Sequence, residues 1–138
     1  MELDDKIYKK ITKLTDEGNE MIERDDILSA INKYMSALQL VPNPKEIWEA
    51  STWIYTALGD SYFLIEHYDE ALNYLFKTLN CPGGLDNAFI MLRIGQCFFE
   101  MKNISKAKEY LLRAYMCDGI DIFEDEDEKY FKLLKSVL

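Results

Sequence analysis

The sequence predicts an all-α fold made of three consecutive pairs of helices. Three segments align without a gap: LTDEGNEMIERDDILSAINKYMSALQLVP, YTALGDSYFLIEHYDEALNYLFKTLNCPG and MLRIGQCFFEMKNISKAKEYLLRAYMCDG. Each contains a glycine followed twelve positions later by an alanine: Gly18 and Ala30, Gly59 and Ala71, Gly95 and Ala107. Large apolar residues recur at spacings of three, four and seven on both sides of the turn in each segment, which indicates two amphipathic helices per segment. A repeated unit of this length is typical of a solenoid.

Within each repeat, small and large side chains alternate at fixed places. Three positions after the glycines lie Met21, Tyr62 and Phe98. Four positions after the alanines lie Tyr34, Leu75 and Leu111. We expect the glycine and the alanine to let two helix backbones approach closely, with the larger side chains filling the space beside them.

Turn and breaker residues place the helix ends. The turns are expected at ERDD, EHYDE and KNISK, where Asp, Asn and Ser can accept the free amide hydrogens of the next helix. Pro42 and Pro44, then Pro82 with two glycines, then Gly119 end the second helix of each pair. The predicted repeats cover about 4–42, 45–82 and 86–119, all within a single domain, 1–138.

The repeated pattern resembles the tetratricopeptide repeat (TPR) family, whose helix pairs carry small residues and aromatics at these offsets. The matching residues, between about 11 and 119, are Gly18, Ala30, Tyr34, Ala37, Pro42, Leu58, Gly59, Tyr62, Ala71, Gly95, Phe98, Ala107 and Ala114. The resemblance implies a right-handed superhelix of three helix-turn-helix repeats whose first helices line a concave groove.

The spacing between repeats departs from the family, whose usual period is about 34 residues. From Gly18 to Gly59 the interval is 41 residues (59 − 18), and from Gly59 to Gly95 it is 36 (95 − 59). Because the glycine-to-alanine spacing is constant, the additional residues lie between repeats. We expect them to lengthen a single helix that starts after Pro44 and contains Trp48 and Trp53, which either pack on the preceding repeat or anchor a partner.

Both ends of the chain add to the repeats. Leu3, Ile7, Ile11 and Leu14 form one stripe, which predicts that the first helix extends ahead of its repeat. Residues 121–138 predict a capping helix, with its acidic residues in the first turns and its lysines toward the far end, as the helix dipole favours. The acidic run from Glu124 to Glu128 is therefore interpreted as the start of this helix rather than as a docking tail.

Composition excludes several classes of function. The net charge of −9 argues against nucleic acid, because phosphate binding needs clustered lysine and arginine. No apolar run is long enough to span a membrane and no secretory signal is visible, so a cytoplasmic protein is expected. His67 stands alone without a metal-ligand pattern, and Cys81, Cys97 and Cys117 are expected to be buried free thiols. We expect no cofactor, no metal and no enzymatic reaction.

The TPR resemblance implies a protein-binding surface on the first helices. The candidate partner-binding residues at the groove positions are Asn19, Glu23, Trp53, Thr56, Asp60, Phe63, Phe89, Arg93, Gln96 and Glu100. Some relatives grip a terminal carboxylate with Lys, Asn and Arg, and here Asn19 and Arg93 stand at two of those positions. Thr15 and Ala57 replace a needed lysine and asparagine, so terminal carboxylate recognition is not expected. Alternatively, apolar groove residues such as Phe63 belong to the core.

Three functions remain open at this point. The first is a small interaction module that binds an apolar or basic segment of a partner protein in its groove. The second is a dedicated inhibitor, such as an immunity protein, that neutralises a basic toxin or enzyme through complementary charge. The third is a scaffold that associates with itself through exposed repeat edges; a monomer or weak homodimer is expected otherwise.

Overall fold

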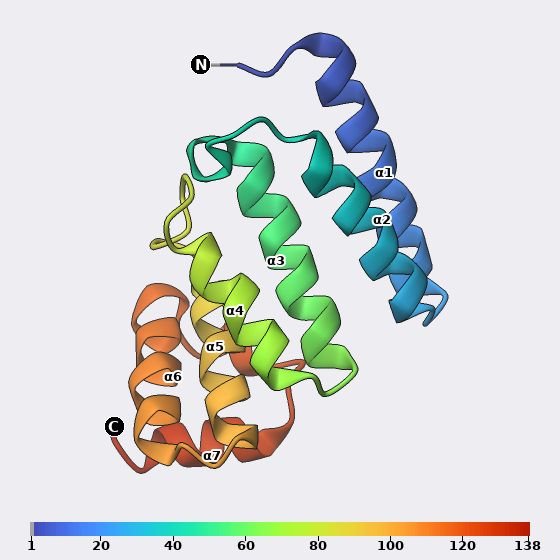
Figure 1. The fold of residues 1–138 in the computed structure, drawn as a ribbon. Helices are drawn as coiled ribbons and strands as arrows, with labels where there is room; N and C mark the ends of the chain where they lie inside the picture. The colour runs from blue at the N-terminus through green and yellow to red at the C-terminus, as the bar shows by residue number, and fades with distance from the viewer. Residues whose placement is uncertain (1) are drawn as a thin grey trace. The chain divides into compact units, whose positions relative to one another are not determined.

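The computed structural model describes residues 2–138, and these residues form seven α-helices, two short 3-10 helices and no strand (Figure 1). The predicted all-α class is confirmed. Two compact units are present, an N-terminal unit that ends at Gly84 and a C-terminal unit that starts at Leu85.

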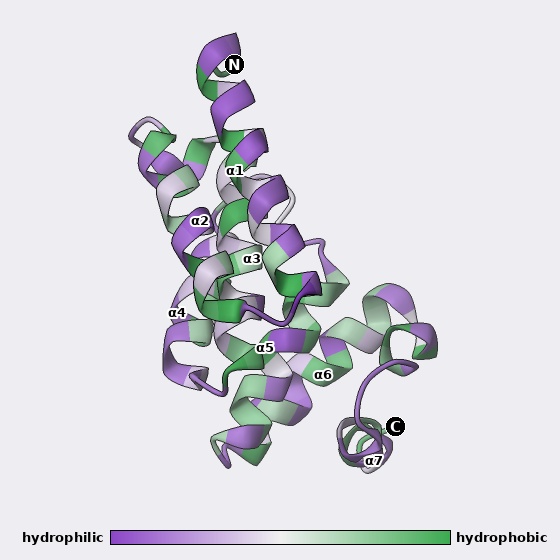
Figure 2. Ribbon diagram, turned by 90° about the vertical axis from the view of Figure 1, so that its right-hand side faces the viewer, coloured by the Kyte–Doolittle hydropathy of each residue, from purple (hydrophilic) through white to green (hydrophobic). Residues whose placement is uncertain are grey.

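The N-terminal unit begins with the helix pair α1 (Asp5–Glu23) and α2 (Ile27–Leu40). Asp26 accepts the Ser29 amide and caps α2, as the turn ERDD predicted, and Asp4, for which no cap was predicted, accepts the Lys6 amide at the start of α1. Figure 2 shows polar and apolar residues alternating along α1, as an amphipathic helix requires. Ile11 on its apolar side is fully buried.

The second pair, α3 (Glu49–Leu64) and α4 (Tyr68–Thr78), starts later than the sequence predicted. Instead of one helix from Pro44, a 3-10 turn covers Lys45–Ile47 and the backbone is extended at Trp48. The polar groups of this turn explain the break: the Trp48 indole Nε1–H donates to the Pro42 carbonyl at 3.0 Å. Lys45 Nζ donates to the Val41 carbonyl at 2.6 Å at the end of α2. Lys45 Nζ also donates to the Leu38 carbonyl at 3.1 Å, so this lysine bonds to a carbonyl in the last turn of α2 and ties the linker to that helix.

The glycines of the repeats permit close helix contact, as predicted. A Cβ added at Gly18, Gly59 or Gly95 would lie 2.5, 2.6 or 2.8 Å from the nearest atom of Tyr34, Leu75 or Leu111 respectively. Those three partners are the residues four positions after each repeat alanine. Larger residues at the glycine positions would push the paired helices apart, which close packing does not tolerate without cost.

The turns into the second helices follow the sequence prediction with one exception. Asn103 caps the last pair by accepting the Lys106 amide at 3.3 Å. At the second turn, however, the residue in the cap position is His67, and its side chain forms no capping bond. Asp69 and Glu70 lie instead in the first turn of α4, where negative charge interacts favourably with the helix dipole.

The C-terminal unit consists of α5 (Ala88–Glu100), α6 (Ile104–Asp118), a 3-10 turn (Ile120–Phe123) and α7 (Glu128–Lys135). The predicted capping helix over 121–138 is therefore too long: α7 starts seven residues later. Gly119, at φ 78°, turns the chain out of α6. Asp127 caps α7 by accepting the Lys129 amide at 3.0 Å, so of the acidic run only Glu128 lies inside the helix.

Candidate functional site

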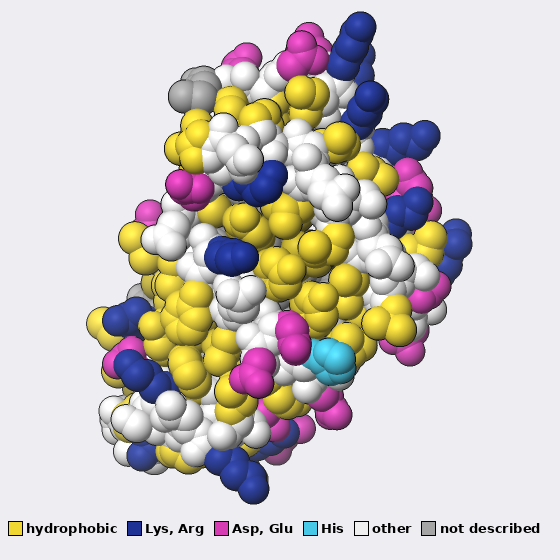
Figure 3. All heavy atoms as spheres, in the orientation of Figure 1, with side chains coloured by type: hydrophobic (Ala, Val, Ile, Leu, Met, Phe, Trp, Pro, Cys, Tyr) yellow, Lys and Arg dark blue, Asp and Glu magenta, His cyan; other side chains and the backbone are white. Residues whose placement is uncertain are grey.

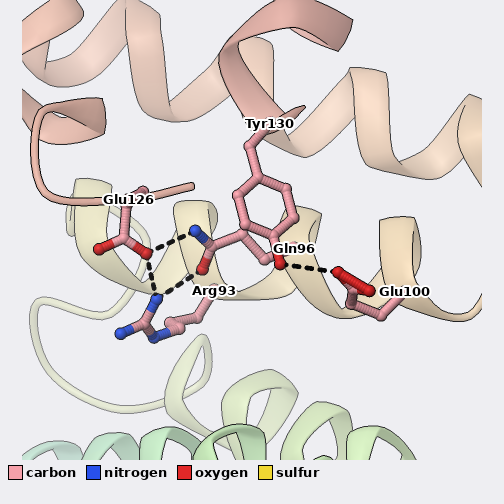
Figure 4. A network of polar contacts seen from close by, with 5 residues as sticks. All are labelled: Arg93, Gln96, Glu100, Glu126 and Tyr130. Carbon is pink, nitrogen blue, oxygen red and sulfur yellow. Dashed lines mark hydrogen bonds and ion pairs between the residues drawn. The ribbon is translucent and has the colours of Figure 1, made fainter. Parts of the chain in front are cut away.

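On the C-terminal unit, the candidate residues of α5 are joined to the acidic segment that precedes α7 (Figure 4). The Glu126 carboxylate accepts one hydrogen bond from Arg93 Nη1 and one from Gln96 Nε2, both at 2.6 Å. Arg93 Nη1 also donates to Gln96 Oε1 at 2.6 Å. Gln96 is fully buried and Arg93 is 9% exposed. A buried guanidinium needs a partner carboxylate, and Glu126 supplies it.

The end of α5 holds the same segment through Tyr130 (Figure 4). The Tyr130 hydroxyl donates to Glu100 Oε1 at 2.9 Å, and its ring meets Phe99 edge to face at 5.2 Å. Lys129 forms an ion pair with Glu100. The helix α7 therefore covers the end of α5 through polar and aromatic contacts together.

The structure thus brings three of the four α5 candidates, Arg93, Gln96 and Glu100, into contact with the chain's own C-terminal segment. Phe89, the fourth, lies beneath the Arg93 guanidinium at 4.9 Å from its ring centre. Sequence reasoning assigned the acidic run to a helix dipole and missed Glu126 as a partner of Arg93. A sequence separation of 33 residues carries no signal for that pairing.

On the N-terminal unit, Asn19, Tyr34 and Asp60 lie together. The Tyr34 hydroxyl donates to Asn19 Oδ1 at 2.6 Å. Burial, together with the negative charge of Asp60, raises the pKa of Tyr34 to about 12. The Asn19 side-chain oxygen is therefore already used as an acceptor, although the residue is exposed, and Glu23 is exposed near the end of α1.

The other α3 candidates differ in their availability. The Thr56 hydroxyl donates to the Thr52 carbonyl at 2.6 Å, so it completes its own helix. Phe63 packs edge to face on Tyr68 at 5.7 Å. Trp53 is 41% exposed, and its ring contacts that of Tyr8 of α1 at 6.1 Å between ring centres, so it packs on the preceding repeat while part of its surface stays accessible.

His67 is exposed immediately before α4. His67 Nδ1 lies 3.7 Å from Glu70, and its ring stacks on Tyr62 at 6.2 Å. Figure 3 shows this histidine at the edge of hydrophobic side chains that gather over α3 and α4. Within residues 2–138, no group of histidine, cysteine and carboxylate side chains is placed to hold a metal ion.

The cysteines correct one expectation. Cys81 and Cys97 are buried free thiols as predicted, and burial raises the pKa of the Cys81 thiol. Cys117, by contrast, is exposed near the end of α6, one residue before the helix ends at Asp118. Among the helices described, none combines the length and apolar character that crossing a membrane requires.

Comparison with solved structures identifies the fold. The chain superposes on the C-terminal TPR-containing domain of a putative Plasmodium falciparum FK506-binding protein with a TM-score of 0.76, at 18% identity over 98% of this chain and 90% of that one. This chain has a TPR-like fold. About three repeats are present, as the glycine and alanine pattern predicted.

Two further neighbours contain bound peptides. The first TPR of Spaghetti (RPAP3), bound to an HSP90 peptide, has a TM-score of 0.71 at 16% identity, over 94% of this chain and 90% of that one. The Yersinia enterocolitica type III secretion chaperone SycD, in complex with a peptide of the translocator YopD, has a TM-score of 0.74 at 11% identity, over 94% and 92%. No protein-family model matches the sequence, and the comparison with curated proteins finds no match.

Proposed function

We propose that this protein is a non-enzymatic interaction module that binds a segment of a partner protein on the first helices of its TPR-like repeats, in the groove that this fold implies. The observation that carries the proposal is the chain's own segment from Glu126 to Tyr130, which lies on α5. Arg93 and Gln96 bind the carboxylate of this segment's Glu126. Glu100 accepts a hydrogen bond from the Tyr130 hydroxyl, and Phe99 contacts the Tyr130 ring. We infer that the corresponding positions of α1 and α3 hold a foreign segment in a similar way.

The α5 residues already bind the chain's own segment, so α1 and α3 are the first helices left for a partner. A partner that contacts Arg93 or Gln96 has to displace Glu126 and leave a buried charge without its counter-ion, which is costly. Glu23 is exposed, and Thr56 and Asp60 are half-exposed. We propose that the partner segment is bound chiefly by the first helices of the N-terminal unit.

The chemistry of these positions favours an apolar or basic partner. The chain carries 25 acidic and 16 basic residues, and Glu23 and Asp60 place two of the acids on the proposed surface. Complementary charge speeds association and penalises acidic competitors. No cofactor, nucleic acid or membrane enters the proposal.

The experiment is capture of partners from a lysate of the native organism, followed by mass spectrometry, with matched variants as bait. The test variant combines Glu23→Lys and Thr56→Lys, which places two cations on the α1 and α3 surface without touching the buried core. The control variant, Asp118→Lys, introduces a cation at an exposed residue of α6. We expect the partner to be retained by the wild type and the control and lost by the test variant, at unchanged far-UV circular dichroism. Equal retention by all three would contradict the proposed surface.

A second function, the dedicated inhibitor, is supported by the net charge of −9. If the captured partner is a basic enzyme or toxin, adding this protein at a molar ratio of one to one should abolish the partner's activity. An active complex would instead identify an adaptor.

A further inference from the structure

A pocket of about 330 Å³ lies at the starts of α1 and α3 in the N-terminal unit. Its lining comprises Glu2, Leu3, Asp5, Tyr8, Trp48, Glu49, Ala50 and Trp53. Three of these eight residues are aromatic and three are acidic. The volume falls at the lower end of the range for small-ligand sites, which suits one side chain rather than a folded surface.

The aromatic side chains of the pocket are held in place yet remain accessible. Tyr8 and Trp53 meet edge to face, with ring centres 6.1 Å apart and planes at 78°, and they are 46% and 41% exposed. Trp48 is fixed by the hydrogen bond from its Nε1–H to the Pro42 carbonyl. Its only polar atom is thereby used, and the ring contributes apolar and π surface to the lining.

The charged groups of the pocket all have the same sign. Glu2, Asp5 and Glu49 are exposed residues that line it, and no lysine, arginine or histidine is among the lining residues. An anionic ligand would be repelled by three carboxylates. A neutral apolar ligand would remove water from them without compensation. A cation gains from the carboxylates and from the negative faces of the rings at once.

We propose that this pocket binds the cationic side chain of an arginine or lysine in the partner segment. The proposal rests on the proposed function and deepens it, because Trp53 belongs both to the pocket and to the proposed partner surface. It assigns Tyr8 and Glu49 a role that the repeat pattern did not indicate, and for Trp48 and Trp53 it selects the partner-anchoring alternative. The additional residues between the first two repeats then supply a binding site as well as a linker.

The chain offers a direct reporter, because its only two tryptophans both line the pocket. The probe is acetyl-Gly-Arg-Gly-amide, with acetyl-Gly-citrulline-Gly-amide as its uncharged counterpart. Titrations follow tryptophan fluorescence and the two indole N–H signals in nitrogen-15 NMR spectra. We expect the arginine peptide to produce a saturable change at millimolar concentration, and the citrulline peptide to bind at least about tenfold more weakly.

Two variants and a control identify the groups responsible. The double variant Asp5→Asn, Glu49→Gln should weaken arginine-peptide binding about tenfold and remove most of its salt dependence. Trp53→Leu should abolish the change at the remaining indole, whereas Asp118→Asn, which alters an exposed carboxylate outside the pocket, should bind like the wild type. Circular dichroism checks that each variant is folded.

The outcomes separate this inference from the proposed function. The inference is overturned if the arginine peptide gives no saturable change, if citrulline binds equally well, or if the double variant binds like the wild type. A partner captured from the lysate and lost by the Glu23→Lys, Thr56→Lys variant would in that case still support the interaction module. Conversely, a pocket that selects arginine supports the inference even if that variant retains its partner.

Discussion

Replacing Glu126 with alanine should destabilise the C-terminal unit by an amount that the geometry allows to be estimated. The Glu126 side chain is 19% exposed and that of Arg93 is 10% exposed, so the pair is largely shielded from water. Removing one partner of a buried ion pair costs about 3–5 kcal/mol, because the other charge is left uncompensated.

Two features lower that figure here. Arg93 and Gln96 keep their mutual bond at 2.6 Å, and the shortened side chain lets water approach the guanidinium. A hydrogen bond to a charged group contributes about 1.5–3 kcal/mol net, so we expect a loss of about 2–3 kcal/mol in the free energy of unfolding. For a chain of this length, that loss lowers Tm by roughly 6–12 °C.

The assay is urea unfolding followed by far-UV circular dichroism, with native-state hydrogen exchange of the α7 amides to locate the effect. The control is Glu124→Ala, an exposed acid of the same run whose side chain forms none of the hydrogen bonds or ion pairs described for Glu126. We expect the control to change stability by less than about 0.5 kcal/mol. If Glu126→Ala and Glu124→Ala are equally mild, the run acts as a diffuse charge and the assigned role of Glu126 is refuted.

Three further predictions test other parts of the fold. Gly84→Ala should lower the free energy of unfolding, measured by urea unfolding, by more than about 2 kcal/mol, because the added Cβ would lie 1.9 Å from the Thr78 carbonyl oxygen. A loss below about 1 kcal/mol would show that the turn relaxes to accept the side chain. Since the pKa of Tyr34 is raised to about 12 from an unfolded value of about 10, the unfolded state loses this proton first, and stability should fall between pH 10 and 12. Tyr34→Phe should flatten that fall, measured by urea unfolding at each pH, and an unchanged slope would assign it to other tyrosines. Cys117 should react with a thiol reagent such as dithionitrobenzoate within minutes, whereas the two buried cysteines should react only in denaturant; three fast thiols would contradict the described burial.

The repeat architecture could be predicted because its signals are local or strictly periodic. Glycine, alanine and a bulky residue at fixed offsets reflect one requirement, close contact between two adjacent helices, repeated along the chain. Asp26 and Asn103 likewise mark helix starts because a cap bonds to amides only a few residues away. The break before α3 was missed, because the hydrogen bonds of Lys45 to the end of α2 and of Trp48 to Pro42 beyond it outweigh the helical propensity of the segment.

The candidate site was predicted only as a set of positions. The TPR resemblance placed Arg93, Gln96 and Glu100 on one side of a helix, but their partners are Glu126, Lys129 and Tyr130, about thirty residues later. Nothing in the acidic run distinguishes Glu126 from its neighbours. Which carboxylate meets the arginine depends on where Gly119 and the 3-10 turn direct the chain.

By itself, the sequence determined the helix pairs, their order and the absence of any recognisable catalytic motif. These follow from periodicity, turn chemistry and composition, all of which act over short distances along the chain. Only the tertiary structure decided that the end of the chain occupies α5, and that Tyr8, Trp48 and Trp53 meet beside three carboxylates. Both features join residues that are distant in sequence, and such contacts are fixed by the packing of whole helices.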